Sequence, residues 1–371
     1  MAFSVHPVET KRDLETFIKL PYWIYRDDKN WVPPLLTEER KKFSKKNPSL
    51  FHCDYQYFLL FQDGKAVGRI VAFVHRQAVE HWKEPVGSFG CYECIDNVEA
   101  SKLLLDAARK WLKDRGMVCM RGPWDFDTKE YGFVVKGFDL QPMVMAPYNP
   151  QYYNSQMEAY GMKKVKDLLA YHLDCRQGYN LPERFLKLTD RIAEKYGVKV
   201  RSLNMKQLEK DVKIIVDLAN ECTAPNWGYV PVTDEEAHAI AKSMKPIVDP
   251  DIVMIAEVDG KPVGYLIVFP DVNTVIKDLN GRLLPFGFLK FFFGLKKIRQ
   301  YRVWALGVIP EYQRKAIDTL FYRRLYDVLY PKGPTIVEAN YVLEDNMAMS
   351  NPILKLGFKE AKRYRVYEVG I

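Results

Sequence analysis

Cysteine is scarce in this chain, which excludes disulfide-stabilised proteins. Only six cysteines occur in 371 residues, too few for a disulfide framework in a chain of this length, so we expect reduced thiols. Cys91 and Cys94 have the spacing of a redox motif or of half a zinc site, but no second pair follows them. They fall within a strand-like run, so we expect both in a hydrophobic core, and we expect no metal site.

Long apolar segments are also missing. No run of about 18 uncharged apolar residues occurs anywhere. Residues 1–11 lack a positively charged start followed by an apolar stretch, which is the pattern of a secretory signal. The composition, 48% hydrophobic and 27% charged, is typical of globular domains. We expect a cytoplasmic protein without stable membrane insertion.

The charge balance is basic. A formal net charge of +8 favours an anionic ligand, but it does not choose between a nucleotide cofactor, a nucleic acid and a membrane. The basic residues are scattered, with short clusters at 40–46 and 296–302. We expect most of these basic residues to lie on solvent-exposed faces and in loops.

An internal repeat is the most informative feature that is present. DGKAVG at 63–68 recurs as DGKPVG at 259–264, each between two apolar runs, which predicts a β-hairpin with a glycine-containing turn. YGMK at 160–163 is matched by LGFK at 356–359. Both pairs are 196 residues apart, so we predict two related domains, 1–180 and 181–371.

Each half is predicted to contain the same order of elements. In the first half these are a strand at 3–8, a helix opening near Thr10, the hairpin, a strand at 87–95, a helix capped by Asp96 and ended by Gly116, a strand at 117–121, a short helix up to Gly161 and a strand at 166–173. A linking helix at 181–196 and a strand at 198–203 begin the second half. Insertions at 122–148 and 272–300 interrupt the order, and we expect specificity to be built there.

The segment VWALGVIPEYQRKAID at 303–318 resembles the acyl-CoA-binding motif of the GNAT acetyltransferases, a strand followed by a glycine-rich loop that opens a helix. Free N–H groups and the helix dipole suit a pyrophosphate at such a helix start. The resemblance implies these cofactor-binding residues: Leu306, Val308, Gln313, Arg314, Lys315, Ala316, Ile317 and Asp318.

The motif departs from the family at several positions. Ala316 and Asp318 replace two small residues, and an aspartate is unfavourable beside a diphosphate. Whether this loop still binds CoA is left open. Asn346, followed by Gly357, is similar to a second family segment and is implied to bind the cofactor. Ile353 stands where many members have a tyrosine that protonates the leaving thiolate, and Met157 stands there in the first half. We expect both in the helix core.

The resemblance covers essentially the whole chain and implies an α+β protein of two GNAT-like domains in tandem, each a mixed, largely antiparallel sheet flanked by helices. The first half has no glycine-rich loop before its helix, so we expect it to lack its own cofactor site. Because the fold usually places a base on a central strand, Glu338 and Glu93 are candidate catalytic bases, and Tyr153 is a candidate acid or substrate anchor. Each also has an ordinary alternative role in ion pairing or aromatic packing.

The function that this resemblance implies is acyl-CoA-dependent N-acyl transfer, directly from acetyl-CoA or another acyl-CoA to a small-molecule amine or a lipid-like acceptor. One alternative is a tRNA-dependent aminoacyl transferase, under which alone tRNA is a partner; no DNA is expected. Another is a non-catalytic acyl-CoA-binding or sensing protein. The acceptor, the acyl length and the oligomeric state are left open.

The apolar stretch 283–297, flanked by lysines, is too short to span a bilayer. It could pack between the domains or as a lid, cover a lipid-like ligand, or lie on a membrane. We expect it to pack over the acyl-acceptor cleft.

Overall fold

The computed structural model describes residues 2–126, 131–245 and 248–371. The chain forms two compact units. Unit 1 consists of Met1–Leu169, Ile276–Phe288 and Lys362–Ile371, and unit 2 of Ala170–Val275 and Leu289–Ala361. The predicted domains 1–180 and 181–371 follow the repeat in the sequence. Unit 1 differs from the first predicted domain because it also includes the two later segments, Ile276–Phe288 and Lys362–Ile371.

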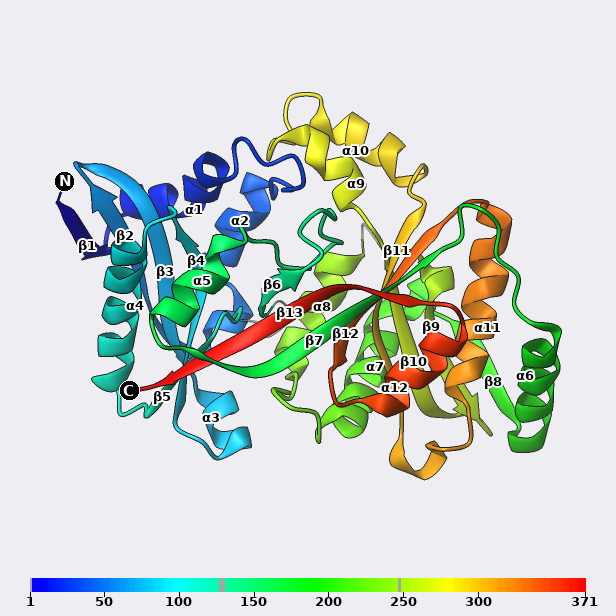
Figure 1. Ribbon diagram of the computed structural model, residues 1–371. Coiled ribbons are helices and arrows are strands. Elements are labelled where there is room, and N and C mark those ends of the chain that lie inside the picture. Colours follow the sequence, from blue (N-terminus) through cyan, green and yellow to red (C-terminus); the bar gives the residue numbers. More distant parts are fainter. Residues whose placement is uncertain (1, 127–130, 246–247) are drawn as a thin grey trace. The chain divides into compact units, whose positions relative to one another are not determined.

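Unit 1 is a twisted sheet with helices on both faces (Figure 1). Its elements are β1 (Phe3–Pro7), α1 (Lys11–Ile24), α2 (Leu36–Lys42), β2 (Cys53–Gln62), β3 (Lys65–His75), α3 (Arg76–Trp82), β4 (Val86–Cys94), α4 (Val98–Lys113), β5 (Cys119–Gly122), β6 (Phe133–Lys136), α5 (Tyr152–Ala159) and the start of β7 (Lys163–Asp174). The strands follow the order β1-β2-β3-β4-β5, and only β4 and β5 run parallel. The short strand β6 lies inside the stretch 122–148, which the sequence pattern left irregular.

The last strand of the chain, β13 (Lys359–Gly370), completes the sheet of unit 1. It runs antiparallel to β5, with Tyr367 opposite Gly122 and Gly370 opposite Cys119. The C-terminal residues therefore belong to the core of the unit that the N-terminus begins.

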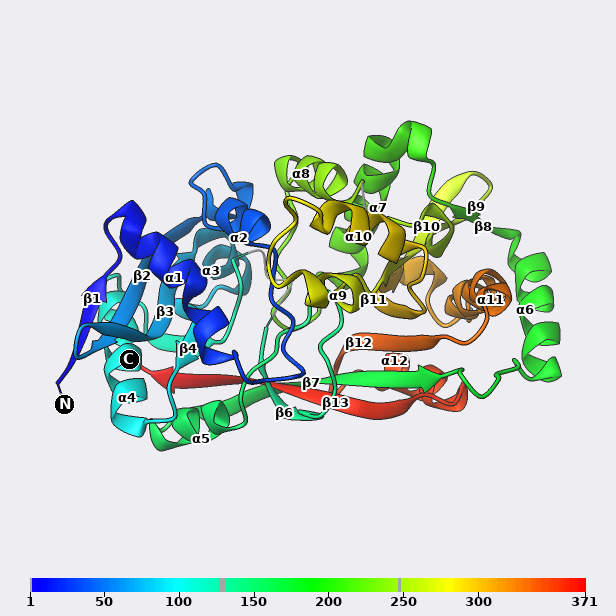
Figure 2. The ribbon, with the colours of Figure 1, turned by 90° about the horizontal axis from the view of Figure 1, so that it is seen from above.

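Two helices cover opposite faces of this sheet, as Figure 2 shows for α1 and α4. Neighbouring residues on β2 point to opposite sides. The ring of Tyr57 contacts that of Phe17 on α1, with centroids 5.0 Å apart, while Leu60 joins the core cluster that includes Leu104 of α4. The alternation of buried residues thus produces a three-layer unit.

Side-chain caps fix the ends of these helices. The Thr10 side chain accepts a hydrogen bond from the Asp13 N–H in a capping box, which confirms the predicted helix start. The predicted cap of α4, Asp96, is wrong by one residue. Asn97 caps α4, because its side chain accepts the N–H of Ala100 at 2.9 Å.

Unit 2 repeats this architecture. Its elements are the end of β7, α6 (Glu183–Tyr196), β8 (Val198–Ser202), α7 (Leu208–Thr223), α8 (Asp234–Met244), β9 (Val253–Val258), β10 (Lys261–Pro270), most of α9 (Asn273–Ile276), most of α10 (Gly287–Leu295), β11 (Gln300–Val308), α11 (Asp318–Leu329), β12 (Ile336–Leu343), α12 (Met347–Lys355) and the start of β13. The strand order β12-β11-β10-β9-β8 is antiparallel except for β11 and β12.

The repeated hairpin turns have the same backbone in both units. Asp63 and Gly64 have φ of 49° and 79°, and Asp259 and Gly260 have φ of 49° and 77°. Positive φ at both central residues is the geometry of a tight hairpin turn of type I′, which aspartate followed by glycine favours. The shared sequence thus produces a shared turn.

Alternate residues of β9 divide the core of unit 2 into two layers. Met254 and Ala256 belong to the cluster that includes Phe321 of α11, whereas Ile255 belongs to the cluster that includes Ile215 of α7. Helices therefore cover both faces of this sheet as well.

The insertion 272–300 contains the two short helices α9 and α10. No helix in the described ranges is both long enough and apolar enough to cross a membrane. The expectation that 283–297 packs over the acyl-acceptor cleft stays a prediction. None of the residues of α10 is buried. Phe291 and Leu295 are half-buried, while Phe292 and Phe293 are exposed.

Candidate active site

The two parallel strands of unit 2 separate partway along their length. β11 and β12 are paired from Gln300 opposite Ile336 to Val303 opposite Ala339. Beyond that point β11 continues to Val308 and β12 to Leu343 without further pairing to each other. The backbone at the end of β11 is therefore open on its β12 side, and the side chains of Leu306 and Val308 pack against the core.

A buried polar network lies where these strands separate. Glu338, on β12, is completely buried and hydrogen-bonds Nε2 of His172 through one carboxylate oxygen. Its other carboxylate oxygen accepts a hydrogen bond from the side-chain amide of Asn340, two residues further along the same face of β12. The Asn340 side-chain oxygen in turn accepts a hydrogen bond from Nε of the buried Arg302 on β11.

His172 is the accessible end of this network. Its side chain is 21% exposed, whereas that of Glu338 is 0% exposed. A histidine whose Nε2 is held by a carboxylate has its tautomer and ring orientation fixed, so that Nδ1 can accept a proton. Sequence analysis predicted Glu338 as a site residue but not His172. No sequence pattern relates a single histidine in a strand to a partner 166 positions away.

The predicted phosphate loop has the backbone of a glycine-rich loop without the glycines. Arg314 and Ala316 have φ of 61° and 57°, in the left-handed region that glycine adopts most easily. Among the described residues, no backbone carbonyl accepts a hydrogen bond from the N–H groups of 314–317. The N–H groups of 314–317 are therefore available to an anion.

The remaining side chains of the loop hold it in place. Ile317 is buried beneath it, and the side-chain amide of Gln313 donates to the carbonyl of Val308 at 3.0 Å. The ammonium of Lys315 lies 4.3 Å from the ring centroid of Tyr312. Asn346 caps α12 by accepting the N–H of Met349 at 3.1 Å, and its predicted contact with a cofactor stays a prediction.

Asp318 is the residue of the loop that opposes an anion. It begins α11 and is half-buried. Burial raises the pKa of its carboxyl, although the N–H groups of Asp318 and Thr319 partly lower it. An ionised carboxylate at this helix start occupies the place where the dipole would otherwise favour a phosphate. The loop therefore offers free backbone N–H groups to an anion but carries one unfavourable charge.

The other predicted catalytic residues belong to the interior of unit 1. The Tyr153 hydroxyl donates to a carboxylate oxygen of Glu93 at 2.8 Å and accepts the N–H of Cys94 at 3.0 Å. A nitrogen of Arg69 lies 3.5 Å from the other Glu93 oxygen. Burial raises the pKa of Glu93 despite Arg69, and it raises that of Tyr153. These contacts give both residues a role in the core, and their catalytic role stays a prediction.

Ile353 and Met157 are buried in α12 and α5, as expected of helix core residues. Neither can donate a proton. Cys94 is buried and Cys91 half-buried, and no disulfide occurs in the described part of the chain. In the described ranges no cluster of three metal-ligating side chains is present.

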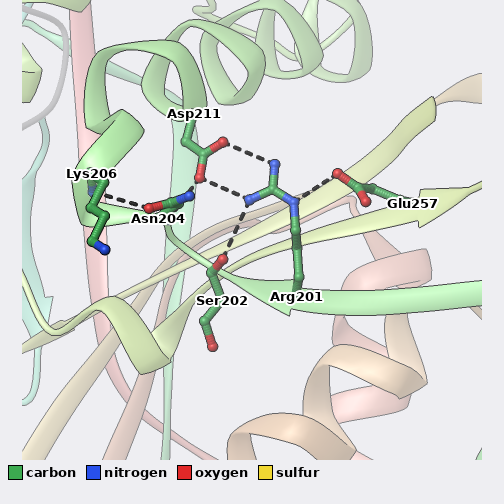
Figure 3. Close-up of polar contacts among 6 residues, drawn as sticks. All are labelled: Arg201, Ser202, Asn204, Lys206, Asp211 and Glu257. Atoms are coloured by element: carbon green, nitrogen blue, oxygen red, sulfur yellow. Dashed lines mark hydrogen bonds and ion pairs between the residues drawn. The ribbon is translucent and has the colours of Figure 1, made fainter. Parts of the chain in front are cut away.

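Unit 2 also contains a cavity that the sequence analysis did not anticipate. Its volume is about 850 Å³, and it lies between the end of β8, the start of α7 and the β9–β10 turn. Figure 3 shows its central feature, Arg201, held by two carboxylates. Two guanidinium nitrogens bind Asp211 at 2.8 and 2.9 Å, and Nε binds Glu257 at 2.7 Å.

The charges in this cavity are largely neutralised by one another. Burial alone would raise the pKa of Asp211, but hydrogen bonds from Arg201 and from the Asn204 N–H outweigh it and lower that pKa. Arg201 is engaged by two carboxylates, so its charge is not available to a ligand in the cavity. The three side chains form a structural ion-pair cluster. Lys206 and Lys210 are exposed at its edge.

Comparisons with known proteins identify the family. No protein-family model matches the chain. Protein YghO of Escherichia coli (strain K12) is 33% identical over 365 residues, which cover 96% of this chain and 93% of that protein. A protein of Caulobacter vibrioides (strain NA1000 / CB15N) named bacterial ceramide synthase is also 33% identical, over 374 residues that cover 98% of this chain and 97% of that protein.

The solved structures confirm the predicted fold. A tandem GNAT protein from the clavulanic acid biosynthesis pathway superimposes with a TM-score of 0.57, at 13% identity, over 100% of this chain and 98% of that chain. At that identity the likeness concerns the fold alone. Together with the two full-length relatives, it shows that the chain belongs to a family of tandem GNAT-like proteins that includes protein YghO and the bacterial ceramide synthase.

Proposed function

We propose that the protein is an acyl-CoA-dependent N-acyltransferase whose acceptor is a lipid-like amine. The observation that carries the proposal is the contact between His172 and the buried Glu338 where β11 and β12 separate. The name of one relative, bacterial ceramide synthase, supports a lipid-like acceptor, since a ceramide is the amide of a long-chain amino alcohol. The GNAT fold of the chain supports acyl-CoA as the donor.

In this proposal His172 is the general base. Glu338 holds Nε2, so Nδ1 accepts the proton that the amine loses as the amide forms. A neutral imidazole can accept a proton at one ring nitrogen while the other nitrogen is hydrogen-bonded. The buried Glu338 stabilises the imidazolium ion that results, as the aspartate does in a serine protease triad.

Asn340 and Arg302 act as positioning residues. A buried carboxylate is stable only when other groups compensate its charge. Asn340 donates to the Glu338 carboxylate and accepts from Arg302, so it connects the carboxylate to a buried cation. This chain of contacts keeps Glu338 aimed at His172.

Acyl-CoA would supply the activated acyl group as a thioester. The N–H groups of 314–317 are the groups that would hold its phosphates. The open edge at the end of β11 offers further backbone donors to the acyl carbonyl. Asp318 weakens this site, and the proposal accordingly expects modest affinity for CoA.

Transfer is direct in this proposal. Burial raises the pKa of Cys222 to about 12 and also raises that of Cys175, so neither thiol of unit 2 is activated as a nucleophile. The amine nitrogen forms the bond to the acyl carbon, the carbon–sulfur bond breaks, and His172 takes the amine proton. His172 then returns that proton to the sulfur, so that the leaving group departs as the thiol.

The experiment compares donors, acceptors and histidine variants. Purified protein is incubated with acetyl-CoA or palmitoyl-CoA and with ethanolamine or a long-chain amino alcohol. Acceptor-dependent thiol release and the mass of the amide are measured. We expect amide formation with the long-chain amine, and a fall of at least about 100-fold in kcat/KM for His172→Gln.

A matched histidine provides the control. His238 also lies beside a glutamate, Glu209, at 3.6 Å, but the two side chains are 64% and 75% exposed. His238→Gln should therefore retain the wild-type rate. Undiminished turnover in His172→Gln would exclude His172 as the base. Acyl-CoA binding by calorimetry without any turnover would favour the non-catalytic alternative, and transfer from charged tRNA alone would favour the aminoacyl transferase.

A further inference from the structure

We infer that the exposed face of α10 and the turn before it dock onto the surface of an anionic lipid bilayer. The docking surface, called the apolar patch below, consists of Leu284, Phe286, Phe288, Leu289, Phe292 and Phe293. This inference concerns where the protein works and does not depend on the proposed function.

The apolar patch is an unusual concentration of exposed hydrophobic side chains. Leu284 and Phe286 are 76% and 75% exposed, and Phe292 and Phe293 are 57% and 68% exposed. Other large exposed hydrophobic residues in the described ranges are scattered along the sequence, as Phe51 is at 55%. Contiguous exposed apolar surface marks an interaction site.

The opposite face of α10 is anchored, so the patch belongs to a fixed helix. At Gly294 an added Cβ would lie 2.5 Å from a methyl group of Val275, which shows how closely the helix approaches α9. Phe291 and Leu295 are half-buried, while Phe292 and Phe293 point to solvent. A helix with one packed and one exposed apolar face is suited to a second apolar environment.

The charge around the patch selects an anionic partner. Residues 279–310 contain no aspartate or glutamate. Arg282, Lys296, Lys297 and Arg299 are all exposed next to the patch. A second copy of this chain would bring equal positive charges together, which opposes self-association. Anionic headgroups would instead attract these side chains while the phenylalanines enter the acyl boundary.

The size of the helix is that of an interfacial element. α10 has nine residues, which is about 13 Å of helix, less than half of a hydrocarbon core of about 30 Å. It would lie in the plane of the interface, and the flanking lysines can extend toward the headgroups.

Vesicle co-sedimentation tests the inference with the full chain. Wild-type protein should bind vesicles of phosphatidylglycerol and phosphatidylcholine more tightly than vesicles of phosphatidylcholine alone, and added salt should weaken the binding. Phe292→Ser combined with Phe293→Ser should reduce the affinity by about 10-fold or more. Lys296→Gln combined with Lys297→Gln should reduce it by roughly 5-fold per lysine, and only for anionic vesicles.

Matched variants separate docking from misfolding. Phe51→Ser removes a phenylalanine of similar exposure outside the patch and should bind like wild type. Phe292→Leu with Phe293→Leu keeps the patch apolar and should retain most of the binding. All variants should keep the wild-type thermal transition. The inference is overturned if wild type does not bind anionic vesicles, or if the serine variant only loses self-association in analytical ultracentrifugation or only loses acyl-CoA affinity.

Discussion

Arg302 and Glu338 are opposite each other in the parallel pair of β11 and β12, one position before that pairing ends. Both side chains are completely buried. Asn340 links them through one hydrogen bond to each. Two opposite charges removed from water depend strongly on each other, because the removal of one leaves the other uncompensated.

Arg302→Met should therefore lower the free energy of unfolding by about 3–5 kcal/mol, since it removes the buried cation that Asn340 connects to Glu338. Urea denaturation at pH 7 measures this. The double variant Arg302→Met with Glu338→Gln should lose less than the sum of the two single variants. Strictly additive losses would show that the two charges are not coupled.

Ala316→Gly should stabilise the protein by roughly 0.5–1 kcal/mol. Alanine at φ 57° carries a left-handed penalty of about 1–2 kcal/mol that glycine avoids, less the entropy that glycine adds to the unfolded chain. Gly197→Ala is the reverse control, because Gly197 has φ 62° and open space around an added Cβ. It should destabilise by about 1 kcal/mol. A loss of stability in Ala316→Gly would contradict the argument.

Much of the fold followed from local patterns in the sequence. The hairpin turns were predictable because aspartate and glycine favour positive φ at two successive positions. The helix at Thr10 was predictable because its capping box is encoded within four residues. The tandem arrangement followed from the repeat, and the structural comparison confirms it.

Features that depend on long-range contacts could not be predicted. The pairing of β13 with β5 joins Tyr367 to Gly122, which are far apart in the sequence, and no local pattern encodes such pairing. His172 and Arg302 likewise join Glu338 from different strands. The cavity around Arg201 combines residues of β8, α7 and β9. The sequence could therefore name the loop and one carboxylate, but not the network around that carboxylate.

Asp318→Asn should strengthen acyl-CoA binding by about 10-fold at pH 7, because it removes a charge that repels the phosphates. Burial raises the pKa of Asp318, so its carboxylate is neutralised at a higher pH than an ordinary aspartate. Wild-type affinity should accordingly rise as the pH falls through that pKa, and Asp318→Asn should lack this rise. Calorimetry across pH measures both. Asp327→Asn, at the other end of α11, is the control and should bind like wild type.

Asp211→Asn should destabilise the protein by about 1.5–3 kcal/mol at pH 7, because Arg201 then loses a two-point ionic contact with a buried carboxylate (Figure 3). Hydrogen bonds from Arg201 and Asn204 outweigh burial and lower the pKa of Asp211. A lowered pKa in the folded state means that the carboxylate contributes stability above its unfolded pKa of about 3.9. That contribution is lost as the pH falls through the folded-state pKa, so the difference in stability between wild type and Asp211→Asn should shrink below about pH 4.

Asp217→Asn, on the same helix but exposed and paired with Lys213, is the control and should change stability by less than about 0.5 kcal/mol. Urea denaturation at pH 7 and at about pH 3 measures the three proteins, and a difference that persists unchanged at the lower pH would show that the ionised pair does not stabilise this end of β8.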